Sequence, residues 1–371
     1  MRLVPDTLVD RLRTELVGRQ GLRSASIDVP NDPFDFARTG AALVDRAVAF
    51  AGPDGVRVAG LGTAWRAASS GPARFTELRD RIGDSDIGDR RAFLGFSFLD
   101  EPRDDTIWSG YAAAEAFVPR IGIEGTDDGA TITVTVPSTD DVEPTLGLLA
   151  SMRTPEWVAV EDSGDHTTES HPPIAVWAGQ VDAALKAIGA GDIDKVVLAR
   201  SVVVTGTESP PILRLFRSLV RSYPQCYNFA WKSGEGVFLG ASPELLGAVR
   251  DGRFSANPLA GSAPRGEGSD EDDAIGRLLL SSEKDRREHA YVVDGIAAAM
   301  ASCASDITAP ATPALKKLAS VQHLSSTVTA SMNDGTGLLD AIDAIHPTAA
   351  VGGAPTAAAV DLIEHLESVD R

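Results

Sequence analysis

Thr131-Ile132-Thr133-Val134-Thr135-Val136 alternates polar and apolar side chains without a break. This period of two is typical of a β-strand with one buried face. The stretch follows Glu124-Gly125-Thr126-Asp127-Asp128-Gly129, whose composition predicts a turn, and residues 117–123 before that turn are again β-prone. The sequence therefore predicts a hairpin within an antiparallel, strand-rich layer.

The same pattern extends toward the N-terminus. Residues 44–50, 56–67 and 92–99 are short β-prone segments, and residues 72–82 favour a helix between them. We therefore predict an N-terminal, strand-rich region over residues 1–160. Residues 162–173 are polar and include His166 and His171, and we interpret them as a solvated linking loop in preference to a metal site.

The second half of the chain contains strands and helices in blocks. Residues 173–190 have helical spacing, residues 195–204 form an apolar run that predicts a strand buried on both faces, and residues 272–302 predict one long helix. Residues 321–331 favour a strand. Because the elements do not alternate as regular βαβ units, we predict an α+β fold with a second region over residues 173–371.

Composition limits the classes of partner. The formal net charge is −19, from 34 Lys and Arg against 53 Asp and Glu. No basic stripe for nucleic acid is visible. No apolar stretch predicts a signal peptide or a membrane span, and two cysteines, Cys226 and Cys303, make no disulfide framework. We expect a cytoplasmic protein that binds neither nucleic acid nor membrane.

Two ionisable residues lie at the ends of apolar segments. Lys195 begins the strand 195–204, and it is either a lysine that extends to solvent from a strand end or a desolvated amine that acts as a base. Glu244 follows the turn-forming Ser242-Pro243 and precedes two leucines. It is either a solvated loop carboxylate or a general acid that faces a pocket.

Three further stretches have both a structural and a functional interpretation. Gly261 lies in a loop-like segment where a glycine permits close approach of the backbone. Asp285 and Glu288 are three residues apart on one helix face, so they either form surface ion pairs or point inward as ligands for a cation such as Mg²⁺. His323 lies within a strand, where a core or edge role is the usual one.

Taken in order, these stretches resemble the chorismate-utilising enzymes, which include isochorismate synthase, salicylate synthase and anthranilate synthase component I. The resemblance runs from about residue 173 to the end of the chain. It rests on six stretches: Lys195-Val-Val-Leu-Ala-Arg200, Gly240-Ala-Ser-Pro-Glu-Leu-Leu246, Pro258-Leu-Ala-Gly-Ser262, Ser282-Glu-Lys-Asp-Arg-Arg-Glu-His289, Gln322-His-Leu324 and His346-Pro-Thr-Ala-Ala-Val-Gly-Gly353.

The resemblance implies a Mg²⁺-dependent reaction on chorismate. Lys195 would deprotonate a water that attacks C2, and Glu244 would protonate the C4 hydroxyl as it leaves. Glu288 would be a metal ligand, with Asp285 behind it. These roles require a lowered pKa for the lysine and a raised pKa for the glutamate.

The same resemblance implies the residues around the substrate. Gly261 and Ser262 would line the substrate site, His323 would lie near the ring, and Thr348 would belong to a loop that approaches the site. It also implies a monomer without a glutaminase partner.

The resemblance also distinguishes subgroups. Anthranilate and aminodeoxychorismate synthases usually lack a lysine at position 195, and the latter tend to carry a nucleophilic lysine at position 260, so Lys195 and Ala260 imply water as the nucleophile. The loop His346-Pro-Thr resembles the isochorismate synthases more closely than salicylate synthase. Salicylate synthase, which also eliminates pyruvate, is the alternative.

Family members continue beyond the final helix with strands that carry a second Glu ligand and an Arg and a Tyr that bind substrate, whereas this sequence stops at Arg371. A truncated, non-catalytic remnant is therefore a third interpretation. The product would serve menaquinone or siderophore formation.

Overall fold

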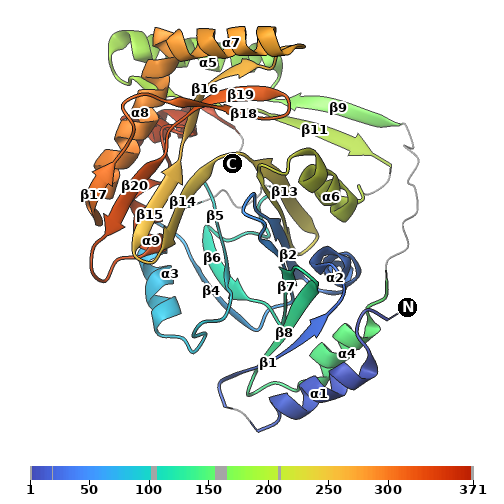
Figure 1. Ribbon diagram of the computed structural model, residues 1–371. Coiled ribbons are helices and arrows are strands. Elements are labelled where there is room, and N and C mark those ends of the chain that lie inside the picture. The colour runs from blue at the N-terminus through green and yellow to red at the C-terminus, as the bar shows by residue number, and fades with distance from the viewer. Residues whose placement is uncertain (1, 19, 102–106, 155–164, 208–209, 369–371) are drawn as a thin grey trace. The chain divides into compact units, whose positions relative to one another are not determined.

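The computed structural model describes residues 2–18, 20–101, 107–154, 165–207 and 210–368 (Figure 1). The chain divides into two compact units. The first comprises Met1–Ser163 and Ser209–Pro243, and the second comprises Gly164–Glu208 and Glu244–Arg371. Residues 209–243 thus belong to the first unit, although the sequence pattern assigned them to the second region. The reason is that this segment adds two strands to the first unit's sheet.

The first unit contains a seven-stranded antiparallel sheet. The predicted hairpin is present in it as β7 and β8, joined by a turn at Asp127 and Asp128. In sheet order the strands are β1 (Leu22–Val29), β8 (Gly129–Pro137), β7 (Ile121–Thr126), β3 (Arg57–Leu61), β2 (Arg46–Ala51), β12 (Tyr227–Ser233) and β13 (Gly236–Ser242). The strand-rich prediction is confirmed, and β1 adds a strand that the polar N-terminal sequence did not indicate.

Alternation along β8 places the core of this unit. Ile132, Val134 and Val136 are fully buried on one face, where they pack with helices, while the threonines between them face the other side. The helices of this unit are α1 (Asp6–Leu16), α2 (Pro33–Gly40), α3 (Arg74–Gly83), α4 (Glu143–Ser151) and α6 (Ile212–Ser222), with a short 3₁₀ turn at Ala41–Leu43. Helix α3 confirms the helix expected at 72–82.

A three-stranded sheet completes the first unit. It contains β4 (Trp65–Ser69), β6 (Ala114–Val118) and β5 (Phe93–Phe96), with β6 in the middle. Glu115 on β6 is only 2% exposed, and its carboxylate accepts hydrogen bonds from Arg66 at 2.8 Å and Arg46 at 3.1 Å. A buried carboxylate of this kind requires its cationic partners.

Within its described residues, the second unit contains four smaller sheets, all antiparallel. The four-stranded sheet is β14 (Leu245–Arg250), β15 (Arg253–Asn257), β20 (Val328–Met332) and β17 (Ala304–Thr308). The three-stranded sheet is β16 (Leu259–Pro264), β19 (Val321–Ser325) and β18 (Ala314–Lys317). Two-stranded sheets pair β10 (Lys195–Val196) with β21 (Gly353–Ala354), and β11 (Ser201–Gly206) with β9 (His166–His171).

The helices of the second unit pack against these sheets. They are α5 (Ile174–Ala190), α7 (Ser269–Ser281), α8 (Glu283–Met300), α9 (Leu338–Ile345) and α10 (Thr356–Leu366). Figure 1 shows α7 above β16, with α8 running down beside β20. The single helix predicted over 272–302 is wrong. The chain breaks at Ser282, whose hydroxyl accepts a hydrogen bond from the Asp285 amide and so starts a new helix.

Three other predictions are corrected. The strand expected at 195–204 is split into β10 and β11, and Val202–Val204 are 46% to 62% exposed where burial was expected, because β11 pairs with the polar strand β9. The described part of the expected loop at 162–173 contains that strand, since backbone pairing does not require apolar side chains. The strand expected at 321–331 is split into β19 and β20, which belong to different sheets.

Removing the buried carboxylate of the first unit should destabilise the protein. We expect Glu115→Ala to lower the free energy of unfolding by about 3 kcal/mol, because it leaves Arg46 in a low-dielectric environment without its partner. Denaturant unfolding measures this difference. Glu124→Ala is the control, since its ion pair with Arg91 is about half exposed and should contribute less than about 1 kcal/mol. Equal losses for the two variants would contradict the argument.

Candidate active site

Lys195 lies at the start of β10, which pairs with β21 through Lys195 and Ala354. The side chain is 9% exposed, and its Nζ donates a hydrogen bond to the Ala349 carbonyl oxygen. Burial lowers the pKa of Lys195, and this outweighs the opposing charges of Glu288 and Glu244. The structure therefore places this lysine in a desolvated environment and not at a solvated strand end.

Glu244 immediately precedes β14 and is largely enclosed. Its Oε1 accepts a hydrogen bond from the Leu259 amide at 3.3 Å. Burial raises the pKa of Glu244 above its ordinary value, and the Leu259 amide and the charges of Lys195 and Lys316 only partly offset this effect. Lys195 and Glu244 thus lie within each other's electrostatic field with pKa shifts in opposite directions.

Helix α8 carries the two predicted carboxylates on its inner face. Val292 and Ile296, which continue that face, are 0% and 3% exposed, and Asp285 and Glu288 are half-buried at its N-terminal end. The carboxylate of Asp285 accepts a hydrogen bond from the Ser282 hydroxyl. Asp285 is therefore engaged in the helix cap, whereas the charge of Glu288 acts directly on Lys195.

Gly261 allows strand β16 to approach helix α8. Its φ of +78° lies in the left-handed region that favours glycine, at a bulge in the pairing with β19. A Cβ added here would lie 3.1 Å from the Cβ of Asp285 and 3.3 Å from Cδ1 of Leu324. Any larger residue would have to push the strand away from the helix.

Ser262 and His323 face each other across β16 and β19. The Ser262 hydroxyl and Nδ1 of His323 are 2.7 Å apart. Burial and the nearby charge of Lys316 lower the pKa of His323, which favours the neutral ring. In the neutral ring either Nδ1 or the Ser262 hydroxyl donates this hydrogen bond, depending on the tautomer.

Thr348 shapes the turn that contacts Lys195. It is 7% exposed, and its carbonyl oxygen accepts hydrogen bonds from the amides of Val351 at 3.1 Å and Gly352 at 2.9 Å. This turn carries the Ala349 carbonyl that binds the Lys195 amine. The sequence did not reveal this acceptor, because a backbone oxygen leaves no side-chain pattern, and it likewise gave no reason to select Lys316.

The predicted site residues thus form linked groups within the second unit. Charge couples Lys195, Glu244 and Glu288, while Gly261 contacts Asp285, and Ser262 pairs with His323. Thr348 joins the first group through the turn that binds Lys195.

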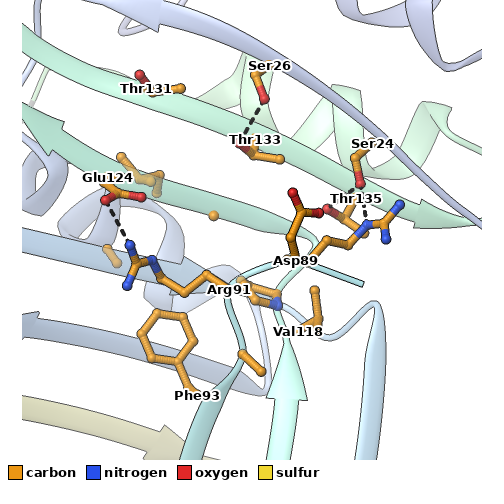
Figure 2. Close-up of a pocket in the computed structure, with 16 residues that line it drawn as sticks. Ser24, Ser26, Asp89, Arg91, Phe93, Val118, Glu124, Thr131, Thr133 and Thr135 are labelled. Carbon is orange, nitrogen blue, oxygen red and sulfur yellow. Dashed lines mark hydrogen bonds and ion pairs between the residues drawn. The ribbon is translucent and has the colours of Figure 1, made fainter. Parts of the chain in front are cut away.

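A cavity of about 680 Å³ in the first unit contains none of these residues. Figure 2 shows hydroxyl pairs on its wall, with Ser26 and Thr133 at 2.9 Å, and the ion pair between Arg91 and Glu124 at 2.8 Å. These polar groups bond to one another, which is the ordinary arrangement on the polar face of a sheet.

The sequence of residues 9–371 matches the family described as chorismate binding enzyme. The chain belongs to this family. It is 32% identical to isochorismate synthase MenF of Bacillus subtilis over 285 residues, which cover 75% of this chain and 60% of that protein. It is 38% identical to the salicylate biosynthesis isochorismate synthase of Pseudomonas aeruginosa over 195 residues, 53% of this chain and 41% of that one. The matches thus span about half the length of these relatives.

Solved structures of chorismate-utilising enzymes have the same fold. MenF, the menaquinone-specific isochorismate synthase from Escherichia coli, superposes with a TM-score of 0.83 at 22% identity, over 99% of this chain and 84% of that one. Anthranilate synthase component I from Streptococcus pneumoniae gives 0.69 at 21% identity, over 85% and 78%. The predicted α+β fold of the chorismate-utilising enzymes is confirmed. Within the described residues, no helix is both long and apolar enough to cross a membrane.

The chemistry of the α8 carboxylates suits a hard cation. Mg²⁺ in proteins commonly takes one or two carboxylates and completes its shell with water and substrate oxygens. Glu288 offers such a carboxylate on the inner face, with Asp285 behind it in the helix cap. The part of the chain that the structure describes contains no group of three or more metal-ligating side chains.

The burial of Lys195 should be visible in the pH dependence of stability. A lowered pKa in the folded state means that the unfolded chain binds more protons between that pKa and about 10.4, so stability rises with pH in this window. We expect Lys195→Met to be no less stable than the wild type at pH 7 and to lose this rise. Denaturant unfolding between pH 7 and 10 tests it, with exposed Lys186→Met as the control. Parallel curves for wild type and Lys195→Met would contradict the desolvation argument.

Proposed function

We propose that this protein converts chorismate to isochorismate in a Mg²⁺-dependent reaction, as an isomerase acting in the cytoplasm. The observation that carries the proposal is the pairing of a buried lysine of lowered pKa with a partly buried glutamate of raised pKa, each affected by the other's charge. Opposed shifts of this kind identify a base and an acid that work at the same pH. The similarity to isochorismate synthases supports it.

Lys195 is the proposed general base. In its neutral form the amine has two N–H groups and a lone pair, so it can keep the hydrogen bond to the Ala349 carbonyl while it accepts a proton from water. The water that loses this proton attacks C2 of chorismate. The positive charge that then forms on Lys195 is stabilised by Glu288 and Glu244.

Glu244 is the proposed general acid. Burial keeps its carboxyl group protonated to a higher pH than usual, so it can give a proton to the C4 hydroxyl, which leaves as water. One water is consumed at C2 and one is released from C4, and the reaction is an isomerisation. The Leu259 amide would hold the carboxylate that remains.

The other site residues would orient the substrate. Gly261 and Ser262 line the site, His323 lies beside the ring, and the turn at Thr348 closes it. Glu288 would hold Mg²⁺, with Asp285 as a supporting carboxylate. When bound, the cation supplies a positive charge for the ring carboxylate and so eases the departure of the hydroxyl. We expect a monomer that needs no glutaminase partner, since water is the nucleophile.

A salicylate synthase is the second candidate, because its first step would use the same base and acid, Lys195 and Glu244. It would form isochorismate first and then eliminate pyruvate. The pathway served by the product is menaquinone or siderophore formation, and the relatives named MenF favour the former.

An assay of residues 1–371 with chorismate and Mg²⁺ tests the activity. We expect isochorismate as the main product, and a loss of about 10²–10⁴-fold in kcat for Lys195→Ala, which removes the base. Chromatography of the products measures both. Full turnover by Lys195→Ala would disprove the base assignment, and salicylate with pyruvate as main products would establish the second candidate. A folded protein that binds chorismate without turnover would instead be a non-catalytic binding protein.

The role of Glu288 can be measured apart from turnover. We expect Glu288→Gln to weaken Mg²⁺ binding about tenfold or more in calorimetric titrations, because it removes a charged oxygen ligand. Glu283→Gln, an exposed neighbour on the first turn of α8, is the matched control. If both variants bind Mg²⁺ like the wild type, the cation lies elsewhere.

A further inference from the structure

Helix α8 is joined to the neighbouring strands by a buried polar pair that the proposed mechanism does not use. Nε2 of His289 and the hydroxyl of Ser326 are 2.8 Å apart, and both residues are only 3% exposed. Ser326 directly follows β19, where the chain passes to β20 in another sheet. Because a buried polar group is costly unless it is hydrogen-bonded, this pair favours one position of α8 on the strands.

The bond to Ser326 is the main polar contact of the His289 ring. The other ring nitrogen, Nδ1, is also buried, and it has no partner of ordinary hydrogen-bond geometry in the part of the chain that the structure describes. The backbone of Ala260 on β16 lies close enough to raise the pKa of His289, against the larger effect of burial. The ring therefore depends on the Ser326 hydroxyl for its orientation.

This pair lies beside Glu288, the proposed ligand of the cation. His289 is the next residue of α8, and Asp285 lies one helical turn before it. Gly261 of β16 approaches Asp285. The preceding residue, Ala260, lies near His289. Two successive residues of β16 thus lie against the turn of α8 that carries Glu288.

Packing holds only part of this turn of α8. A cavity of about 500 Å³ borders the helix, and His289, Ala290 and Val293 are among the residues that line it. Its other wall includes residues 309–311, which follow β17. A helix face that borders a cavity makes fewer packing contacts than one that borders a core, so it resists displacement less. The hydrogen bond to Ser326 opposes a shift of the helix in this direction.

We propose that the His289–Ser326 hydrogen bond positions the Glu288 carboxylate, and that this fixed position favours Mg²⁺ over the larger Ca²⁺. Mg²⁺ requires short, nearly ideal octahedral coordination, whereas Ca²⁺ accepts longer and more variable distances. A carboxylate held in one place therefore suits the smaller ion better. His289 and Ser326 are positioning residues, because they act through Glu288 and do not bind the cation. The part of this inference that concerns the cation rests on the proposed function.

Calorimetric titrations of Ser326→Ala with Mg²⁺ and with Ca²⁺ test the choice of cation. We expect Mg²⁺ binding to weaken about 10–100-fold, the usual effect of losing a partner that orients a metal ligand. Ca²⁺ binding should weaken much less, so the preference for Mg²⁺ falls. Ser326→Thr keeps the hydroxyl, and because Ser326 lines the cavity the added methyl group has room, so this variant should bind both ions as the wild type does. Equal weakening for both ions, or none for either, overturns the proposal.

Two further variants separate positioning from a loss of stability. Ser302→Ala is the matched control, since this exposed serine donates to the Ala299 carbonyl oxygen at the other end of α8 and should leave the preference unchanged. The double variant His289→Leu/Ser326→Ala removes both polar partners, and such a replacement can leave stability nearly unchanged. We expect it to lose the preference for Mg²⁺ as Ser326→Ala does. A folded double variant with the wild-type preference would contradict the positioning role, and thermal unfolding shows which variants are folded.

A measurement without metal separates this inference from the proposed function. The charge of Glu288 raises the pKa of Lys195, so a carboxylate that is no longer held in place should raise it less. NMR titration of the Lys195 side chain, assigned with Lys195→Met, should therefore show a lower pKa in Ser326→Ala, in the same direction as in Glu288→Gln. If the wild type binds no Mg²⁺ but this shift occurs, the cation assignment fails and the positioning of Glu288 stands. If Lys195 in Ser326→Ala titrates as in the wild type, the positioning role is wrong.

Discussion

The desolvation of one lysine amine is the constraint on which the candidate site depends. Lys195 is held by the short pairing of β10 with β21 and by the Ala349 carbonyl, and both keep its Nζ away from water. Two carboxylates oppose the resulting fall in its pKa, yet burial has the larger effect. Burial therefore favours the neutral amine, while the two carboxylates favour the protonated one. That combination suits a base that must be regenerated.

The position of the acids depends in turn on a glycine. Gly261 lets β16 run close to α8, so the strand that carries Ser262 and the helix that carries Asp285 and Glu288 approach one another. A sequence pattern shows that a glycine is present but not what it approaches. The sequence suggested either a close approach to a ligand or a surface loop, and the structure adds the close approach of the strand to α8.

Sequence periodicity predicted the elements whose burial alternates or repeats. Such patterns predicted the hairpin of β7 and β8, helix α3 and the α+β class. In these elements, which side chains are buried follows from their spacing along the chain. The pattern gave wrong predictions where pairing with a strand distant in the sequence determines the structure. Val202–Val204 are apolar but exposed, and the polar segment from His166 to His171 forms a strand because β11 provides its backbone partner. Ser282 interrupts a continuous helical pattern. Its side chain accepts a hydrogen bond from the Asp285 amide, and this cap allows a second helix to begin in a new direction.

The site residues were selected by the order of six motifs and not by their individual chemistry, and the structure explains why single residues were ambiguous. Lys195 and Lys316 are the same residue type, each at a strand, yet their environments differ. The amine of Lys195 is buried against a backbone carbonyl, whereas Lys316 is a half-buried residue on β18. A buried lysine is driven toward neutrality and toward proton transfer, whereas a more solvated one keeps its charge at low cost and can attract an anion. Burial therefore gives the two lysines different electrostatic properties that their residue type alone does not reveal.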